Sequence, residues 1–281
     1  TGTNNRWVAV GEGTNTIAYS SDGATWTGIG TAIFSTAGRS IAYSSTLGLW
    51  IAVGQGTNTI AYSSDGATWT AVLNSSILLP SGYTVSWNGN LFIAGGNSGL
   101  GQIFCYSTDG INWIGNGGYP SYMYEIAYGN NTWISVGTVN NSIAYSPNGF
   151  NWIGRGTSVC AQGNGVSYSP TLNRWVIGCQ GGPPNSIAYS NDGLNWTGAG
   201  TGLFTNGYNS IWAGNKFIIG GQGTYSIGTS SDGITWTGVA GSISLCNAMK
   251  GFFSLDNNKI VGVGYGSTNI FSTAGYGVAY N

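Results

Sequence analysis

The chain has 281 residues, of which seven are lysine or arginine and eight are aspartate or glutamate, so its formal net charge is −1. Its 12 tryptophans, 17 tyrosines and 41% hydrophobic residues exclude a disordered chain, because disordered segments are poor in aromatic residues and rich in charge. Seven cations over this length exclude a basic surface for nucleic acid, and no apolar run is long enough to cross a membrane. We therefore expect no nucleic-acid partner and no membrane insertion.

Six segments of eight residues superpose without gaps, and their tryptophans are 43, 44, 39, 44 and 40 residues apart. The segments are YSSDGATW at residues 19–26 and 62–69, YSTDGINW at 106–113, YSPNGFNW at 145–152, YSNDGLNW at 189–196 and TSSDGITW at 229–236. A period of about 40 to 45 residues, rich in glycine and aromatic residues, is typical of a propeller blade of four strands. The sequence therefore predicts an all-β fold, with residues 1–281 forming a single β-propeller domain.

The second repeat shows the four strands of a blade in chain order: SIAYS at residues 40–44, LWIAVG at 49–54, TIAYS at 59–63 and TWTAV at 68–72. Each run is rich in Ile, Val, Tyr, Trp and Thr and is bounded by Gly, Asn, Ser or Asp, as expected for strands and turns. No segment has a convincing 3.6-residue apolar period, so helix should be nearly absent.

The Asp-Gly pair between the third and fourth strands predicts a tight turn, in which Asp accepts backbone N–H groups and Gly takes a positive φ. This motif resembles the Asp-box repeats of the sialidase-like propeller superfamily, whose pattern is Ser-x-Asp-x-Gly-x-Thr-Trp. Four residues of the first segment match that pattern, with one residue fewer between Asp and Gly: Ser20, Asp22, Gly23 and Trp26. The resemblance implies the propeller fold but no particular activity, because such boxes occur in enzymes, lectins, assembly factors and surface proteins.

The second strand recurs seven times, which predicts seven blades, but the chain begins at a second strand with no first strand before it. Residues 270–281 match residues 33–44 at eight of twelve positions, and the latter end in a first strand. We expect residues 276–280 to pair with residues 6–11 and to close a ring of four-stranded antiparallel blades, with a compact seventh blade over residues 241–273. In the competing register, residues 276–280 form the outer strand of blade seven, and blade one has three strands.

Few groups remain for catalysis, because the chain has no histidine and five of its eight acids lie in the boxes, which leaves Glu12, Glu125 and Asp256. General acid-base catalysis usually needs histidine or a pair of tuned carboxylates. The resemblance suggests sialidase-like chemistry, which would require an arginine cluster and a Tyr/Glu nucleophile pair. Tyr124 and Glu125 are adjacent, but neighbours on a strand point to opposite faces. We therefore expect no catalytic residues, with a sialidase-like glycoside hydrolase as the alternative.

The four cysteines have no C-x-x-C spacing and no histidine to join them, which argues against a zinc site. Each box offers a single aspartate, which is too few oxygen ligands for calcium. We therefore expect no metal and no cofactor. Buried free thiols are the simplest interpretation of the cysteines. Cys160 and Cys179 are the exception, because they lie at opposite ends of a predicted hairpin and are placed to reach disulfide distance.

The connections between second and third strands are the candidate ligand-binding positions, since they gather opposite the boxes and combine amide side chains with glycine. Such amides can bind sugar hydroxyls, and nearby aromatic rings can stack on a sugar. The candidate residues are Glu12, Asn15, Gln55, Asn58, Gln180 and Gln222. The alternative is that these residues only form solvated turns. The composition favours a non-enzymatic module outside the cell or on a cell or virion surface, whose partner is a glycan or other protein subunits.

Overall fold

The structure of the protein is a computed structural model that describes residues 6–97, 102–117, 121–180, 184–239, 255–256, 259–260 and 274–280. This part of the chain is all-β apart from the short helix α1 (Ser75–Leu78), and it contains no helix that is long and apolar enough to span a membrane. The chain divides into two compact units, residues 1–118 with 250–281 and residues 119–249.

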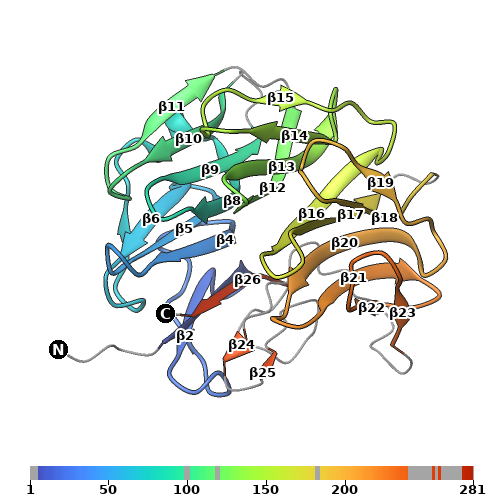
Figure 1. The fold of residues 1–281 in the computed structure, drawn as a ribbon. Helices are drawn as coiled ribbons and strands as arrows, with labels where there is room; N and C mark the ends of the chain where they lie inside the picture. Colours follow the sequence, from blue (N-terminus) through green and yellow to red (C-terminus); the bar gives the residue numbers. More distant parts are fainter. Residues whose placement is uncertain are drawn as a thin grey trace. The chain divides into compact units, whose positions relative to one another are not determined.

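The first unit contains an eight-stranded sheet, a four-stranded sheet and a two-stranded hairpin, all antiparallel (Figure 1). The eight-stranded sheet comprises β1 (Trp7–Glu12), β2 (Ile17–Ser20), β3 (Thr27–Gly28), β4 (Ala37–Ser44), β5 (Leu49–Gln55), β6 (Ile60–Ser63), β7 (Thr70–Ala71) and β26 (Ala274–Tyr280). The four-stranded sheet comprises β8 (Ser81–Trp87), β9 (Phe92–Asn97), β10 (Gln102–Ser107) and β11 (Ile114–Gly117), and the hairpin comprises β24 (Leu255–Asp256) and β25 (Lys259–Ile260).

The second unit contains three four-stranded meanders. The first is β12 (Ser121–Gly129), β13 (Thr132–Val139), β14 (Ile143–Ser146) and β15 (Ile153–Gly154). The second is β16 (Gln162–Ser169), β17 (Arg174–Gln180), β18 (Ile187–Ser190) and β19 (Thr197–Gly198). The third is β20 (Phe204–Trp212), β21 (Phe217–Gly223), β22 (Ile227–Ser230) and β23 (Thr237–Gly238). The predicted four-strand repeat is therefore confirmed.

The eight-stranded sheet is two meanders joined by one residue pair, Glu12 with Ala37. The first of these meanders is completed by β26, whose residue Val278 pairs with Ala9 and whose Tyr280 pairs with Trp7. This is the strand pairing that the sequence predicts for the C-terminal segment, and Figure 1 shows red β26 beside the blue N-terminal strands. Most of the predicted last blade, residues 241–273, lies outside the described residues.

The hydrophobic core of each unit lies between consecutive sheets. The second strand of a meander is buried on both faces, as the unbroken run of buried residues in Leu49–Gly54 of β5 shows. Trp50 packs with Val8 and Val10 of the preceding meander, and Trp175 packs in the same way with Ile134. Burial on both faces explains why second strands read as continuous Ile, Val and Trp runs rather than as alternating patterns.

The predicted Asp-Gly turn forms in the described boxes. In the second repeat, Asp65 Oδ1 accepts two backbone N–H groups at 2.8 and 2.7 Å and the Ser63 hydroxyl at 3.0 Å. Gly66 has a φ of 73°, and its carbonyl accepts the indole N–H of Trp69 at 3.1 Å. Asn148 takes the aspartate's place in the fourth repeat with the same pattern of bonds. These boxes are turn residues that hold the third and fourth strands together.

A β-bulge interrupts the first strand of every meander near its beginning. In β4, Gly38 pairs with Gly54 and Ser40 pairs with Val53, which leaves Arg39 as the extra residue. The same register shift occurs in β26, β8, β12, β16 and β20. The periodicity of the sequence does not reveal this bulge, because the alternation of strand side chains assumes regular pairing.

The exception expected for Cys160 and Cys179 is confirmed, since they form a disulfide with their Cα atoms 5.5 Å apart. Cys105 is buried and free, and burial raises the pKa of its thiol, so it is not a reactive nucleophile. Cys246 lies outside the described residues. The near absence of helix holds except at α1, which follows Asn74 in a left-handed conformation.

Candidate functional site

The candidate ligand-binding residues lie at one end of their meanders, where the second strand ends and the first strand begins. Glu12, Gln55 and Gln180 each close a second strand, and Gln222 is the penultimate residue of β21. The boxes follow the third strand and therefore lie at the opposite end. We call this end of each meander its polar edge.

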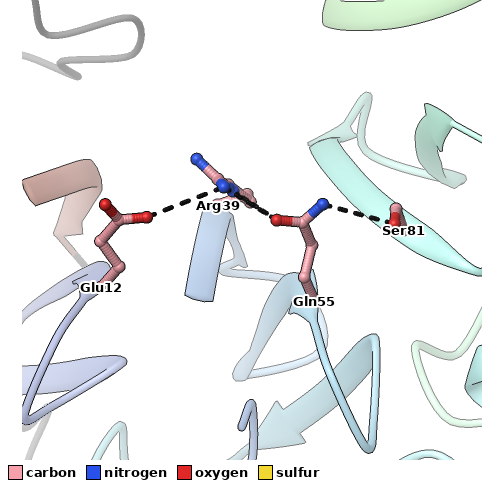
Figure 2. A network of polar contacts seen from close by, with 4 residues as sticks. All are labelled: Glu12, Arg39, Gln55 and Ser81. Atoms are coloured by element: carbon pink, nitrogen blue, oxygen red, sulfur yellow. Dashed lines mark hydrogen bonds and ion pairs between the residues drawn. The ribbon is translucent and has the colours of Figure 1, made fainter. Parts of the chain in front are cut away.

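The first unit has a polar chain across three successive meanders, which we call the first polar cluster: Glu12, Arg39, Gln55 and Ser81 (Figure 2). Arg39 donates from Nε and Nη2 to Gln55 Oε1, at 3.1 and 2.8 Å. Gln55 Nε2 donates to Ser81 Oγ at 3.3 Å, and Arg39 Nη2 lies 3.8 Å from Glu12 Oε2. The cluster therefore presents a cation, an anion and an amide at fixed positions.

The second unit has an equivalent group at its polar edge, the second polar cluster: Gln162, Asn164, Gln180, Asn206, Tyr208 and Gln222. Gln180 Oε1 accepts from Gln162 at 3.2 Å and from Asn164 at 3.3 Å. Asn164 also donates to the carbonyl of Gly207 at 2.8 Å, which joins β16 to β20. Gln222 Oε1 accepts the Tyr208 hydroxyl at 3.0 Å. This cluster has no charged member.

The disulfide braces the second polar cluster. Gly163 pairs with Cys179, and Gln162 pairs with Gln180, so the bond from Cys179 to Cys160 ties the start of β16 to the end of β17. The amides of Gln162 and Gln180 are thereby held on a fixed backbone. Prior fixation of polar groups lowers the ordering cost of ligand binding.

Asn15 and Asn58 stabilise the loops in which they lie. Asn15 Oδ1 accepts the backbone N–H of Gly30 at 2.8 Å, and Asn58 Nδ2 donates to the carbonyl of Ile33 at 3.0 Å. Asn141 makes the same bond as Asn15 in the fourth repeat, to Gly156 at 2.8 Å. The repetition indicates a structural role: the Asn side chain binds the loop between the second and third strands to the residues that follow the fourth strand.

The sequence analysis missed the residues that the bulges bring to the polar edge. Arg39 and Asn164 are each the extra residue of a first strand, and Tyr208 is one of two residues that the register of β20 skips. A signal was present, since a glycine precedes each of them: Gly38, Gly163 and Gly207. Bulges often re-aim side chains next to functional sites.

The bulge also changes the interpretation of Tyr124 and Glu125. Met123 pairs with Gly137 and Glu125 pairs with Val136, so Tyr124 is the extra residue, and strict alternation does not separate the two side chains. Glu125 is only 2% exposed. Ser40 takes the same repeat position, is also buried, and accepts the backbone N–H of Val85 from the next sheet. The position therefore serves packing between sheets in at least one repeat.

Two of the four arginines of the chain, Arg6 and Arg174, lie at the box end of their meanders, opposite the polar edge. Arg6 and Arg174 donate to the carbonyls of Asp65 and Asp232, box residues of the following repeat, at 2.6 and 2.5 Å. Arg155 lies 4.7 Å from the ring centre of Tyr145. Arg6 and Arg174, each of which precedes the tryptophan of a second strand, therefore have the same structural role in their repeats. Among the described residues, no group of three or more Cys, Asp or Glu side chains is placed to hold a metal.

No protein-family model matches the sequence, and no curated protein is similar to it in sequence. In structure, the chain is similar to virginiamycin B lyase from Staphylococcus aureus, with 13% identity, 86% of this chain and 83% of that chain covered, and a TM-score of 0.71. It is also similar to a chain of a nidogen/laminin complex, with 10% identity, 97% of both chains covered and a TM-score of 0.62.

A third similar structure is an ancestral GH74 enzyme, with 14% identity, 96% of this chain and 44% of that chain covered, and a TM-score of 0.65. These proteins are β-propellers, and they include both partner-binding proteins and enzymes. At such identities the similarity shows the fold and no activity. The chain therefore has an all-β fold of four-stranded antiparallel sheets, consistent with a β-propeller.

Proposed function

We propose that the protein is a non-catalytic β-propeller that binds a glycan through its polar edge. The observation that carries this proposal is the concentration of amide, hydroxyl and guanidinium groups at equivalent places of successive meanders in each unit. Sugar hydroxyls both donate and accept hydrogen bonds, and the amide, hydroxyl and guanidinium groups at the polar edge supply both the acceptors and the donors that they need. Of the candidate residues, Glu12 and Gln55 contact a ligand in the first unit, Gln180 and Gln222 contact a ligand in the second unit, and Asn15 and Asn58 shape the loops.

The architecture proposed for this module is a single domain of seven blades in a closed ring. The pairing of β26 with β1 supports closure, because it supplies a first strand to the blade that begins the chain. The hairpin of β24 and β25 supports a further blade after β23. The shortened box supports kinship with Asp-box propellers, since its aspartates make the turn that such boxes imply.

The proposed location is outside the cell or on a cell or virion surface. The disulfide between Cys160 and Cys179 supports it, because disulfides persist in oxidising compartments and are rare in the cytosol. A structural role with other protein subunits is the related possibility, and the nidogen/laminin complex shows that a similar fold occurs in a protein–protein assembly.

The test is binding of the full chain to an array of neutral and acidic oligosaccharides, with isothermal titration of every hit. We expect binding to at least one sugar that is lost in a Gln55→Ala, Gln180→Ala, Gln222→Ala variant of unchanged melting temperature. An array without hits would refute the glycan ligand and leave the protein-subunit role.

A glycoside hydrolase is the second candidate, and the bulge at Tyr124 and the burial of Glu125 at the polar edge favour it. A pair of carboxylates is usual for glycosidases, and the other described acids of the second unit, Asp192 and Asp232, lie in boxes. Binding therefore ranks above hydrolysis. Turnover of fluorogenic glycosides by the chain, abolished by Glu125→Gln, would reverse this order.

A further inference from the structure

Charged side chains are scarce in this protein, and most of the described ones have structural partners. Five aspartates form box turns, Arg6 and Arg174 bind box carbonyls, and Arg155 stacks on Tyr145. Among the described residues, one ion pair stands apart from these uses, that of Arg39 with Glu12. It lies at the polar edge, in the first polar cluster.

The side chains of Arg39 and Glu12 lie near each other without a direct hydrogen bond. Arg39 Nη2 and Glu12 Oε2 are 3.8 Å apart, beyond hydrogen-bond distance, and each side chain is 22% exposed. Gln55 fixes the guanidinium by accepting from both Nε and Nη2. Ser81 in turn fixes the Gln55 amide (Figure 2). The donor is therefore positioned, and donor and acceptor are both reachable from solvent.

We propose that the first polar cluster is a subsite for two adjacent hydroxyls of a neutral sugar, an inference that rests on the proposed glycan-binding function. One hydroxyl oxygen can accept from Arg39 Nη2 and donate to Glu12 Oε2 at the same time. At ordinary hydrogen-bond lengths, the 3.8 Å separation gives an angle of roughly 85° at that oxygen, and roughly 0.8 Å of side-chain movement opens it to the tetrahedral value. Gln55, bonded to the same guanidinium, offers its amide to the adjacent hydroxyl.

The charges of the cluster favour a neutral sugar over an acidic one. A ligand carboxylate on Arg39 would lie beside Glu12, and two like charges at such a distance repel. A ligand cation on Glu12 would meet the Arg39 guanidinium in the same way. A hydroxyl avoids both conflicts, because it is uncharged and satisfies donor and acceptor together.

The experiment measures binding of neutral and acidic oligosaccharides to the full chain and to three variants. Glu12→Gln and Arg39→Gln each remove one charge of the pair, and Arg174→Gln is the control that removes a guanidinium at the box end of a meander, opposite the polar edge. We expect the first two variants to weaken binding of a neutral sugar by about tenfold to a hundredfold, and the control to leave it unchanged. Monodeoxy forms of the sugar should show the same loss when either adjacent hydroxyl is missing.

The most discriminating measurement is a change in ligand specificity in the Glu12→Gln variant. Glu12→Gln keeps the shape of the side chain and removes the repulsion, so this variant should gain binding of a uronic-acid oligosaccharide that the natural protein rejects. Because Glu12→Gln is nearly isosteric, it tests the subsite even if Arg39→Gln fails to fold, which circular dichroism would show.

The possible results distinguish a failure of the subsite proposal from a failure of the proposed glycan-binding function. Neutral-sugar binding that survives Glu12→Gln and Arg39→Gln would overturn the subsite and leave the glycan-binding function intact. A natural protein that binds no sugar overturns both, and one that prefers acidic sugars overturns the subsite alone.

Discussion

At the residue scale, the box aspartate stabilises the fold through short bonds to the backbone. Asp65 Oδ1 accepts two N–H groups and a hydroxyl within the turn. We expect Asp65→Ala to lower the free energy of unfolding by about 1–2 kcal/mol, because these donors lose their acceptor. Urea unfolding measures the change. Unchanged stability together with lost ligand binding would show that the box is a binding site rather than a turn.

The same bonds make stability depend on pH. For Asp109 and Asp192, partial burial acts to raise the carboxyl pKa, but the hydrogen bonds from side chains and backbone outweigh it and lower the pKa to about 2. A lowered pKa in the folded state stabilises the protein above the ordinary value of 3.8 and loses that contribution as the pH falls toward 2. We therefore expect the melting temperature to fall between pH 4 and pH 2.

The control for this pH dependence is already present in the chain, because Asn148 forms the same turn without a titrating group. An Asp109→Asn, Asp192→Asn variant should keep the turn geometry and lose less stability than the natural protein between pH 4 and pH 2. Equal losses in both proteins would show that other groups govern the acid response.

At the element scale, a glycine in the first strand allows consecutive sheets to approach. A Cβ on Gly38 would meet the carbonyl oxygen of Thr16 and lie 2.9 Å from Val10 Cβ, both in the preceding meander. Gly163 and Gly207 meet the preceding sheet at the same repeat position. We expect Gly38→Ala to cost about 1–3 kcal/mol in chemical unfolding, because backbone has to move.

The matched control for Gly38→Ala is Gly202→Ala, since a Cβ on Gly202 meets no atom within 4 Å. That variant should change stability by less than about 0.5 kcal/mol, as an open surface position allows. If both variants were equally destabilised, contact of Gly38 with the preceding meander would not be the cause.

The disulfide acts on the β16–β17 hairpin. Cys160 and Cys179 are 19 residues apart, so Cys160→Ser, Cys179→Ser should lower the free energy of unfolding by about 3 kcal/mol. Reduction of the natural protein with dithiothreitol should cause a similar loss and leave the double variant unchanged. A natural protein that is indifferent to reductant would contradict a stabilising role for the bond.

At the scale of the whole molecule, the pairing of β26 with β1 joins the two ends of the chain. Deletion of residues 274–281 removes this strand from the edge of β1, so the melting temperature should fall sharply. A circular permutant that joins residue 281 to residue 1 and opens the exposed loop at residue 202 should keep or raise the melting temperature. A deletion without thermal effect would contradict a closing role for β26.

The sequence alone predicted the repeat, its strands and its turns, because each depends on local chemistry. The Asp-Gly turn needs only a carboxylate and a glycine within a few residues, and the strands need only β-branched and aromatic runs. The pairing of β26 with β1 was also predictable, since residues 270–281 repeat a segment that ends in a first strand.

The tertiary structure decided which polar groups meet at the polar edge. A bulge adds one residue to a strand and reverses the alternation beyond it, so the positions of Arg39 and Asn164 depend on the register with β5 and β17. The loop roles of Asn15 and Asn58 depend on partners 15 and 25 residues away. The disulfide required the register of Gly163 with Cys179. Such pairings are set by long-range strand geometry, which residue types and spacing do not encode on their own.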